Sequence, residues 1–193
     1  MIIGITGGTG CGKTTLLGIL AAHGCTVLDC DRIYHRLLET DMALLNAIES
    51  HFPNTVEDGK LDRKKLGQMV FSEPAALKTL NKITHSAVKA EVLQLLSPTP
   101  KLAAIDAIGL FEGGLAELCD ITVAVTAPEN ARISRLMRRD GISEKYARIR
   151  IAAQRSQEEF QTLCDFTLAN DSTEEFFQEL CLAFLRQQGI INV

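Results

Sequence analysis

Residues 7–14 read Gly7-Gly8-Thr9-Gly10-Cys11-Gly12-Lys13-Thr14 and fit the pattern G-x-x-x-x-G-K-[ST]. An apolar run at residues 2–6 precedes this stretch directly, and a helical pattern begins near Lys13. Glycine fills four of the eight positions. It permits the tight bend that lets successive N–H groups converge on one phosphate. The alternative is a chance glycine-rich turn, but the match fills every position, so we predict a phosphate-binding loop between a strand and a helix.

The loop predicts a set of nucleotide contacts. Lys13 is expected to reach the outer phosphates, and Thr14 is expected to offer its hydroxyl to Mg²⁺. The helix that begins there adds the positive end of its dipole. The predicted nucleotide-binding residues of this region are Gly8, Thr9, Gly10, Cys11, Gly12, Lys13, Thr14 and Thr15.

Length and composition bound the class of protein. A chain of 193 residues with 46% hydrophobic content suffices for one well-cored α/β domain. The net charge of −4 argues against broad electrostatic binding to nucleic acid or to an acidic membrane. The six cysteines contain no C-x-x-C pair, and neither a signal peptide nor a membrane-spanning run is evident. We therefore expect reduced thiols, a cytoplasmic location and no nucleic-acid or membrane partner.

A second short strand at residues 25–29 ends in an acidic stretch, Asp29-Cys30-Asp31. Strand, loop, helix and strand together form a βαβ unit, in which ligands bind at the carboxyl ends of the strands. Asp31 is therefore placed for chemistry. The alternative is that Asp31 caps the helix that follows, and the sequence leaves both readings open.

Residues 32–97 read as a helical insertion that is too long for a simple crossover. Helices are predicted at residues 42–52, 61–71 and 74–96, separated by Pro53-Asn54 and Asp58-Gly59. Such an insertion usually forms a second binding site or a lid. Its polar residues at 61–63 and 80–85 are candidates for that site, although ordinary solvated helix surface explains them as well.

The second half of the chain continues the alternation of strands and helices. The strand at 102–106 ends in Asp106, which resembles the carboxylate that orients Mg²⁺ in nucleotide-binding proteins. Glu112 lies in the loop that follows, at the same predicted sheet edge. Further strands are predicted at 121–126 and 166–170, with a closing helix at 173–188. The pattern predicts an α/β three-layer domain.

One segment of this acidic chain is basic. Eight of the twenty Lys and Arg residues lie between Arg132 and Arg155, opposed by only two acidic residues. A helix from Pro128 breaks at Asp140-Gly141, and a second helix is predicted at 143–160. Arg132, Arg135 and Arg139 share one face of the first helix, as a lid closing over a nucleotide would require. The alternative is a solvated surface helix.

Motifs spread along nearly the whole chain are similar to those of the dephospho-CoA kinase family. They are Ile5-Thr-Gly-Gly-Thr-Gly-Cys-Gly-Lys-Thr-Thr15, Leu28-Asp-Cys-Asp-Arg-Ile33, Gly59-Lys-Leu-Asp-Arg63 with Val70-Phe71, Leu80-Asn-Lys-Ile-Thr-His85, Leu110-Phe-Glu112, Arg135 to Arg139 with Gln154, and Asp165 with Asn170. The resemblance implies a P-loop kinase fold with a five-stranded parallel sheet between helices. It implies one domain of residues 1–193, with the insertion at about 32–97 and a basic lid at about 139–158. It also implies ATP and Mg²⁺, and phosphorylation of the ribose 3′-hydroxyl of a small-molecule partner, dephospho-CoA.

The resemblance also assigns roles to individual residues. It implies that Asp31 is the general base, that Lys13 steadies the β- and γ-phosphates and that Arg139 contacts the transferring phosphate. Thr14 would hold Mg²⁺, together with Asp106, which is predicted from its place at the end of an apolar strand. Residues implied near the substrates are Arg63, His85 and Glu112 for the acceptor and Asn170 for the nucleotide.

The chain departs from the family pattern at three places. Ile108-Gly109 stands where Pro-Leu is usual, and Ser86 where Pro commonly follows the histidine, and both departures lie at the acceptor side. Cys11 replaces a small hydroxyl residue. One hypothesis is that the loop amides and Lys13 lower its pKa, which would make it oxidisable unless ATP covers it; the alternative is an inert space-filling thiol.

Two other functions fit the phosphate loop alone. One is another P-loop kinase acting on nucleosides or nucleotides, and the other is a nucleotide-dependent switch that hydrolyses slowly. A switch would not need a carboxylate poised to accept a proton from an alcohol, so Asp31 favours the kinase. Oligomeric state is not predicted.

Overall fold

The computed structural model describes residues 1–71 and 73–191 and divides into two compact units. The sheet unit consists of residues 1–28, 100–110 and 116–191, and the helical unit of residues 29–99 and 111–115. The helical unit contains the predicted insertion at 32–97.

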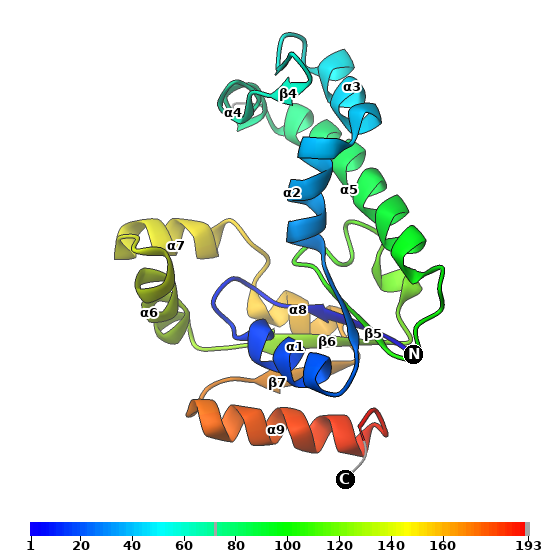
Figure 1. Cartoon of the computed structure of the whole chain (residues 1–193). Coiled ribbons are helices and arrows are strands. Elements are labelled where there is room, and N and C mark those ends of the chain that lie inside the picture. The colour runs from blue at the N-terminus through cyan, green and yellow to red at the C-terminus, as the bar shows by residue number, and fades with distance from the viewer. Residues whose placement is uncertain (72, 192–193) are drawn as a thin grey trace. The chain divides into compact units, whose positions relative to one another are not determined.

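The sheet unit is built on five strands (Figure 1), which confirms the predicted α/β class. They are β1 (Ile2–Thr6), β2 (Thr26–Asp29), β5 (Ala103–Asp106), β6 (Ile121–Thr126) and β7 (Phe166–Ala169). Their order is β2-β5-β1-β6-β7, and β1 pairs in parallel with both β5 and β6. Because β1 is central, the loop that follows Thr6 begins at the middle of the sheet's carboxyl edge.

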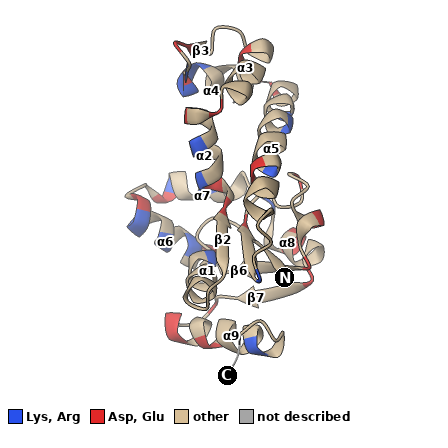
Figure 2. Ribbon diagram, turned by 45° about the vertical axis from the view of Figure 1, so that its right-hand side comes forward, with Lys and Arg blue, Asp and Glu red and all other residues tan. Residues whose placement is uncertain are grey.

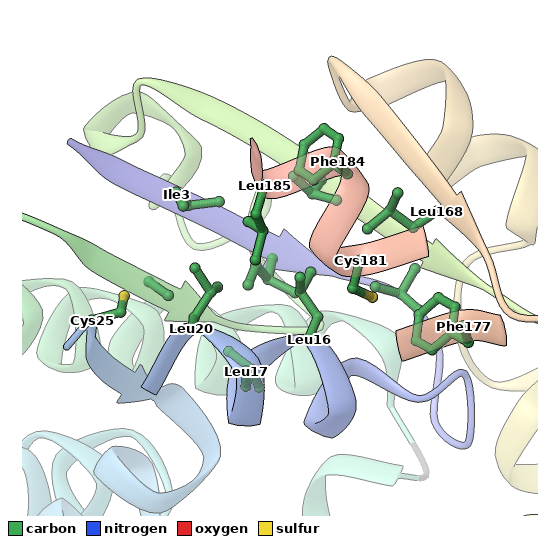
Figure 3. Close-up of a cluster of buried hydrophobic side chains, with 14 of the residues drawn as sticks. Ile3, Leu16, Leu17, Leu20, Cys25, Leu168, Phe177, Cys181, Phe184 and Leu185 are labelled. Carbon is green, nitrogen blue, oxygen red and sulfur yellow. The ribbon is translucent and has the colours of Figure 1, made fainter. Parts of the chain in front are cut away.

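Helices cover the sheet and complete its core. On one side lie α1 (Lys13–Ala22) and α9 (Glu174–Gln187), which contact each other. Figure 3 shows buried side chains of both helices, including Leu16, Leu20 and Phe177, in one cluster with Ile3 of β1. On the other side α8 (Gln157–Leu163) contacts β6. The predicted three layers are therefore present.

The basic segment forms two further helices of the sheet unit. They are α6 (Glu129–Asp140) and α7 (Glu144–Ala152), which pack together. Gly141, in the left-handed conformation at φ 66°, ends α6 as predicted. The prediction of a single helix over 143–160 was wrong, because α7 stops at Ala152 and α8 starts afresh. Ser156 and Glu159 form a reciprocal capping box at that second start.

The helical unit is organised around its longest helix, α5 (Pro74–Leu96). It contacts the three other helices, α2 (Cys30–Thr40), α3 (Met42–His51) and α4 (Arg63–Phe71). The sequence pattern predicts helices here and does not reveal the two short strands that the structure adds. A small antiparallel hairpin joins β3 (Val56–Glu57) to β4 (Lys60–Leu61). Asp58 and Gly59 turn it with φ of 50° and 72°, both positive, as a type I′ hairpin turn requires.

Across the described residues, no helix is both long and apolar enough to span a membrane.

The core of the sheet unit offers a matched pair of neighbouring phenylalanines on α9. Phe177 is 1% exposed and Phe176 is 53% exposed. We expect Phe177→Ala to lower the free energy of unfolding by about 3–5 kcal/mol, because it removes a buried ring and leaves a cavity. Phe176→Ala should change it by no more than about 0.5 kcal/mol. Urea unfolding followed by circular dichroism measures both, and equal losses would contradict the packing described here.

Candidate functional site

The predicted phosphate loop lies between β1 and α1 and has a backbone that requires glycine. Gly7, Gly10 and Gly12 have φ of 136°, 79° and 101°. A Cβ atom on Gly12 would lie 2.2 Å from Nδ2 of Asn170, and one on Gly7 would lie 2.2 Å from the carbonyl oxygen of Val125. Both the dihedral angles and the close neighbours therefore exclude larger residues.

Three side chains from distant parts of the chain hold the outer carbonyl groups of the loop. Nε of Arg132 donates to the carbonyl of Thr9 at 2.9 Å. Arg135 donates to the carbonyl of Gly10 at 3.1 Å and reaches that of Cys11 at 3.4 Å. Nδ2 of Asn170 donates to the Cys11 carbonyl at 2.9 Å, and its Oδ1 accepts from Arg135 at 3.0 Å.

These contacts orient the amides of the loop. In a trans peptide the C=O and the following N–H point in opposite directions. Anchoring the carbonyls of Thr9 and Cys11 outward therefore turns the N–H groups of Gly10 and Gly12 inward. Among the described residues, none accepts a hydrogen bond from the amides of Gly10, Gly12, Lys13 or Thr14. Such a row of amides at a helix N-terminus is suited to an anion.

Positive charge surrounds the loop. Arg132 is 3% exposed, and Arg135 lies beside it on α6, whose basic residues Figure 2 marks in blue. Nζ of Lys13 donates to the carbonyl of Gly7 at 3.0 Å and lies 3.8 Å from Oδ1 of Asp106. Three cations and one carboxylate leave the loop electropositive, as a polyphosphate ligand would require.

The proposed metal ligands lie at the same sheet edge. Thr14 is in the first turn of α1, and Asp106 ends β5, where it pairs in register with Ile5 of β1. The described residues contain no group of three or more His, Cys, Asp or Glu that could hold a metal ion. A magnesium site does not need one, since Mg²⁺ is commonly held by one or two protein ligands with water and substrate phosphates. The residues present fit that ion.

Arg139 behaves differently from the two arginines that hold the loop. Its side chain is 60% exposed and forks onto Asp140 at 2.6 and 3.0 Å, while Arg150 contacts the same carboxylate at 2.6 Å. The hydrogen bond from Arg139, with that from Arg150, lowers the pKa of Asp140 to about 2. The alternative of a solvated helix face is wrong for Arg132 and Arg135. It stays open for Arg139.

The predicted base, Asp31, is exposed and lies in the first turn of α2. The residue that caps this helix is Asp29, whose Oδ1 accepts from the amide of Arg32 at 3.0 Å. The alternative reading of Asp31 as the cap is therefore wrong, because Asp29 already fills that position.

The other acceptor-side candidates also belong to the helical unit. Arg63 begins α4 and is half exposed, near Nδ1 of His35 at 3.4 Å. His85 is half-buried on α5, and Glu112 is exposed in the segment 111–115. Their roles in binding stay predictions.

Cys11 does not have the acidified thiol of the hypothesis. Its side chain is 1% exposed, and burial raises the pKa of the thiol above its ordinary value, an effect that the nearby cations only partly offset. The thiolate is the reactive form, so the structure favours the inert space-filling role.

Comparison with known proteins agrees with this site. The family model described as dephospho-CoA kinase matches residues 1–175. A dephospho-CoA kinase of Streptomyces avermitilis is 37% identical over 173 residues, 88% of this chain and 84% of that protein. One of Anaeromyxobacter dehalogenans is 38% identical over 180 residues, covering 90% and 85%. The structure of a Campylobacter jejuni dephospho-CoA kinase superposes with a TM-score of 0.70 at 28% identity, covering 98% of both chains. With a braced phosphate loop and this agreement along its length, the chain belongs to the dephospho-CoA kinase family.

Proposed function

We propose that the chain transfers the terminal phosphoryl group of ATP to the ribose 3′-hydroxyl of dephospho-CoA, giving CoA and ADP. Membership in the family makes it a kinase that phosphorylates an alcohol of dephospho-CoA. The observation that carries the donor half of the proposal is the phosphate loop, in which the carbonyls of Thr9 and Cys11 are anchored and the amides of Gly10, Gly12, Lys13 and Thr14 have no acceptor among the described residues.

The loop residues bind the phosphate chain. The amides of Gly10, Gly12 and Thr14 donate to phosphate oxygens, and the ammonium of Lys13 leaves the Gly7 carbonyl for the outer phosphates. Thr15 is also in the first turn of α1, so its main-chain N–H belongs to the positive end of the helix dipole. Asn170 serves the nucleotide site by holding the Cys11 carbonyl.

Thr14 and Asp106 hold Mg²⁺ in this proposal. When bound, the ion neutralises charge that develops on the phosphates during transfer. Asp106 also keeps the ammonium of Lys13 close to the loop, at 3.8 Å.

Phosphoryl transfer depends mainly on positioning and charge. Asp31 accepts the proton of the ribose hydroxyl. Its carboxylate is available for this role because Asp29, and not Asp31, caps α2. Arg139 contacts the transferring phosphate, which requires it to exchange the carboxylate of Asp140 for a phosphate oxygen. Arg63, His85 and Glu112 contact the acceptor from the helical unit.

The reaction itself is tested by ADP release from Mg-ATP with and without dephospho-CoA, with the product identified by mass. We expect ADP to form only when the acceptor is present, in step with CoA. An acceptor analogue that lacks the 3′-hydroxyl should bind without releasing ADP. Release that does not depend on the acceptor would instead indicate a nucleotide-dependent switch.

The glycine requirement of the loop gives a second test. In Gly12→Ala, the new Cβ meets Asn170 at 2.2 Å at a φ of 101°, so we expect the affinity for Mg-ATP to fall about tenfold or more. Gly18 of α1 is the control, because a Cβ atom added there would have no neighbour within 4 Å. Gly18→Ala should raise stability by about 0.5–1 kcal/mol and leave binding unchanged. Calorimetric titration with Mg-ATP would measure both, and normal binding by Gly12→Ala would count against the loop.

The base is tested by comparing two neighbouring carboxylates. Asp31→Asn should lower kcat by about two to four orders of magnitude while ATP affinity stays near normal, because only proton acceptance is lost. Asp29→Asn should stay active, since asparagine caps helices as well as aspartate does. Steady-state kinetics decide the matter. A nearly fully active Asp31→Asn would remove Asp31 from the chemistry.

A further inference from the structure

Thr9, in the phosphate loop, has both of its main-chain groups occupied by side chains of the basic segment. Its N–H donates to Oε1 of Gln154 at 2.8 Å, and its carbonyl accepts from Nε of Arg132 at 2.9 Å. Arg132 also donates to Oε1 of Gln154 at 3.3 Å. The three residues close a ring of hydrogen bonds, so the Thr9 amide is not available to a phosphate in this arrangement.

The ring fixes which way the Gln154 amide faces. Both groups that approach this end of the side chain, the Thr9 N–H and the Arg132 guanidinium, are donors. Only the carbonyl oxygen of the amide can satisfy them, because the NH₂ group would place donor against donor. The NH₂ group therefore faces away from both. In the described parts of the chain nothing accepts a hydrogen bond from it, so two donors remain for a ligand.

Gln154 lies beside the first turn of the loop. A Cβ atom on Gly8 would lie 3.1 Å from its Oε1. The ammonium of Lys13 is held at the same turn by the carbonyl of Gly7, at 3.0 Å. The lysine of this motif reaches the β- and γ-phosphates. Gln154 therefore borders the part of the loop that receives the outer end of the phosphate chain.

The charge of Arg132 also indicates an anion at this place. Its guanidinium is 3% exposed, and its hydrogen bonds go to neutral oxygens of Thr9 and Gln154. Within the described chain no carboxylate lies within ion-pair distance of it. A buried cation with neutral partners alone is costly, and a bound phosphate nearby offsets that cost.

We propose that the side-chain amide of Gln154 donates a hydrogen bond to the terminal phosphate of the bound nucleotide, and that Arg132 is the residue that positions it. This inference rests on the proposed function, in which the nucleotide is ATP. Thr9 then acts through Gln154, because its N–H sets the orientation of the amide. The contact exists with ATP and is lost with ADP, so it favours the substrate nucleotide over the product.

The test is Gln154→Glu, which separates holding the loop from binding the phosphate. A glutamate has the same shape and still accepts from the Thr9 N–H and from Arg132, now as a charged partner. The fold should therefore unfold at the same temperature or a higher one. The variant has lost the NH₂ donors and faces the phosphate with negative charge. We expect ATP affinity to fall about tenfold or more, and ADP affinity to change by no more than about threefold.

Gln157→Glu is the matched control. Oε1 of Gln157 also accepts from a main-chain amide at 2.8 Å, that of Ala127, which is outside the phosphate loop. The same chemical change there should leave the affinities for ATP and ADP as they are. Gln154→Leu removes the donors without adding charge, but it also removes the acceptor of the Thr9 N–H and of Arg132, so the expected result is a loss of ATP affinity larger than any loss of ADP affinity.

Unchanged ATP binding by a folded Gln154→Glu would overturn the inference and leave Gln154 as a brace of the loop. Equal losses of ATP and ADP affinity would overturn the assignment to the terminal phosphate. A wild-type chain that binds ATP but forms no CoA would overturn the proposed function alone, because the Gln154 contact is measured by binding.

Discussion

The anchoring of the outer loop carbonyls by α6 and Asn170 is the interaction on which the site depends. A run of glycines with positive φ has many accessible conformations and loses more entropy on ordering than other residues do. The loop by itself therefore does not strongly favour the one conformation in which its amides converge. Arg132 and Asn170 restrict it, because they donate to the carbonyls of Thr9 and Cys11 on the opposite side of the peptide groups whose N–H groups face the phosphate site. Arg135 holds the Gly10 carbonyl between them.

The sheet order explains how residues so far apart in sequence reach the loop. Since β6 pairs with β1 and β7 pairs with β6, the segments that leave the carboxyl ends of these strands start beside the loop. The helix α6 follows β6, and Asn170 directly follows β7. Parallel pairing in this order thus places two arginines and an amide against one turn of eight residues. Asp106 reaches the same sheet edge from the opposite side of β1, because it ends β5, the other strand that pairs with β1.

The sequence predicts what depends on local pattern and misses what depends on distant contacts. The phosphate loop, the five strands and the ends of α5 and α6 follow from motifs, apolar runs and the signals Pro74 and Gly141. The hairpin turn at Asp58-Gly59 and the capping box at Ser156 had local signals that the helical pattern around them outweighed. Arg132 and Gln154 stand out in the sequence as part of the basic segment and of a family motif, but their contacts with Thr9 have no local signal, since Thr9 is 123 and 145 residues away. The pKa of Cys11 also depends on burial, which composition does not reveal.

The chemistry of the proposed reaction is divided between the two compact units. The groups assigned to the phosphoryl donor belong to the sheet unit, and those assigned to the acceptor belong to the helical unit. Asp31 stands where the chain passes from one to the other. It lies two residues after Asp29, the last residue of β2, so covalent geometry alone keeps its Cα within about 7 Å of that strand end. A base at this point stays tied to the sheet whatever position the rest of the helical unit takes. Arg63 and His85, assigned to the acceptor, lie far along the chain from any strand of the five-stranded sheet, so covalent geometry gives them no comparable restraint.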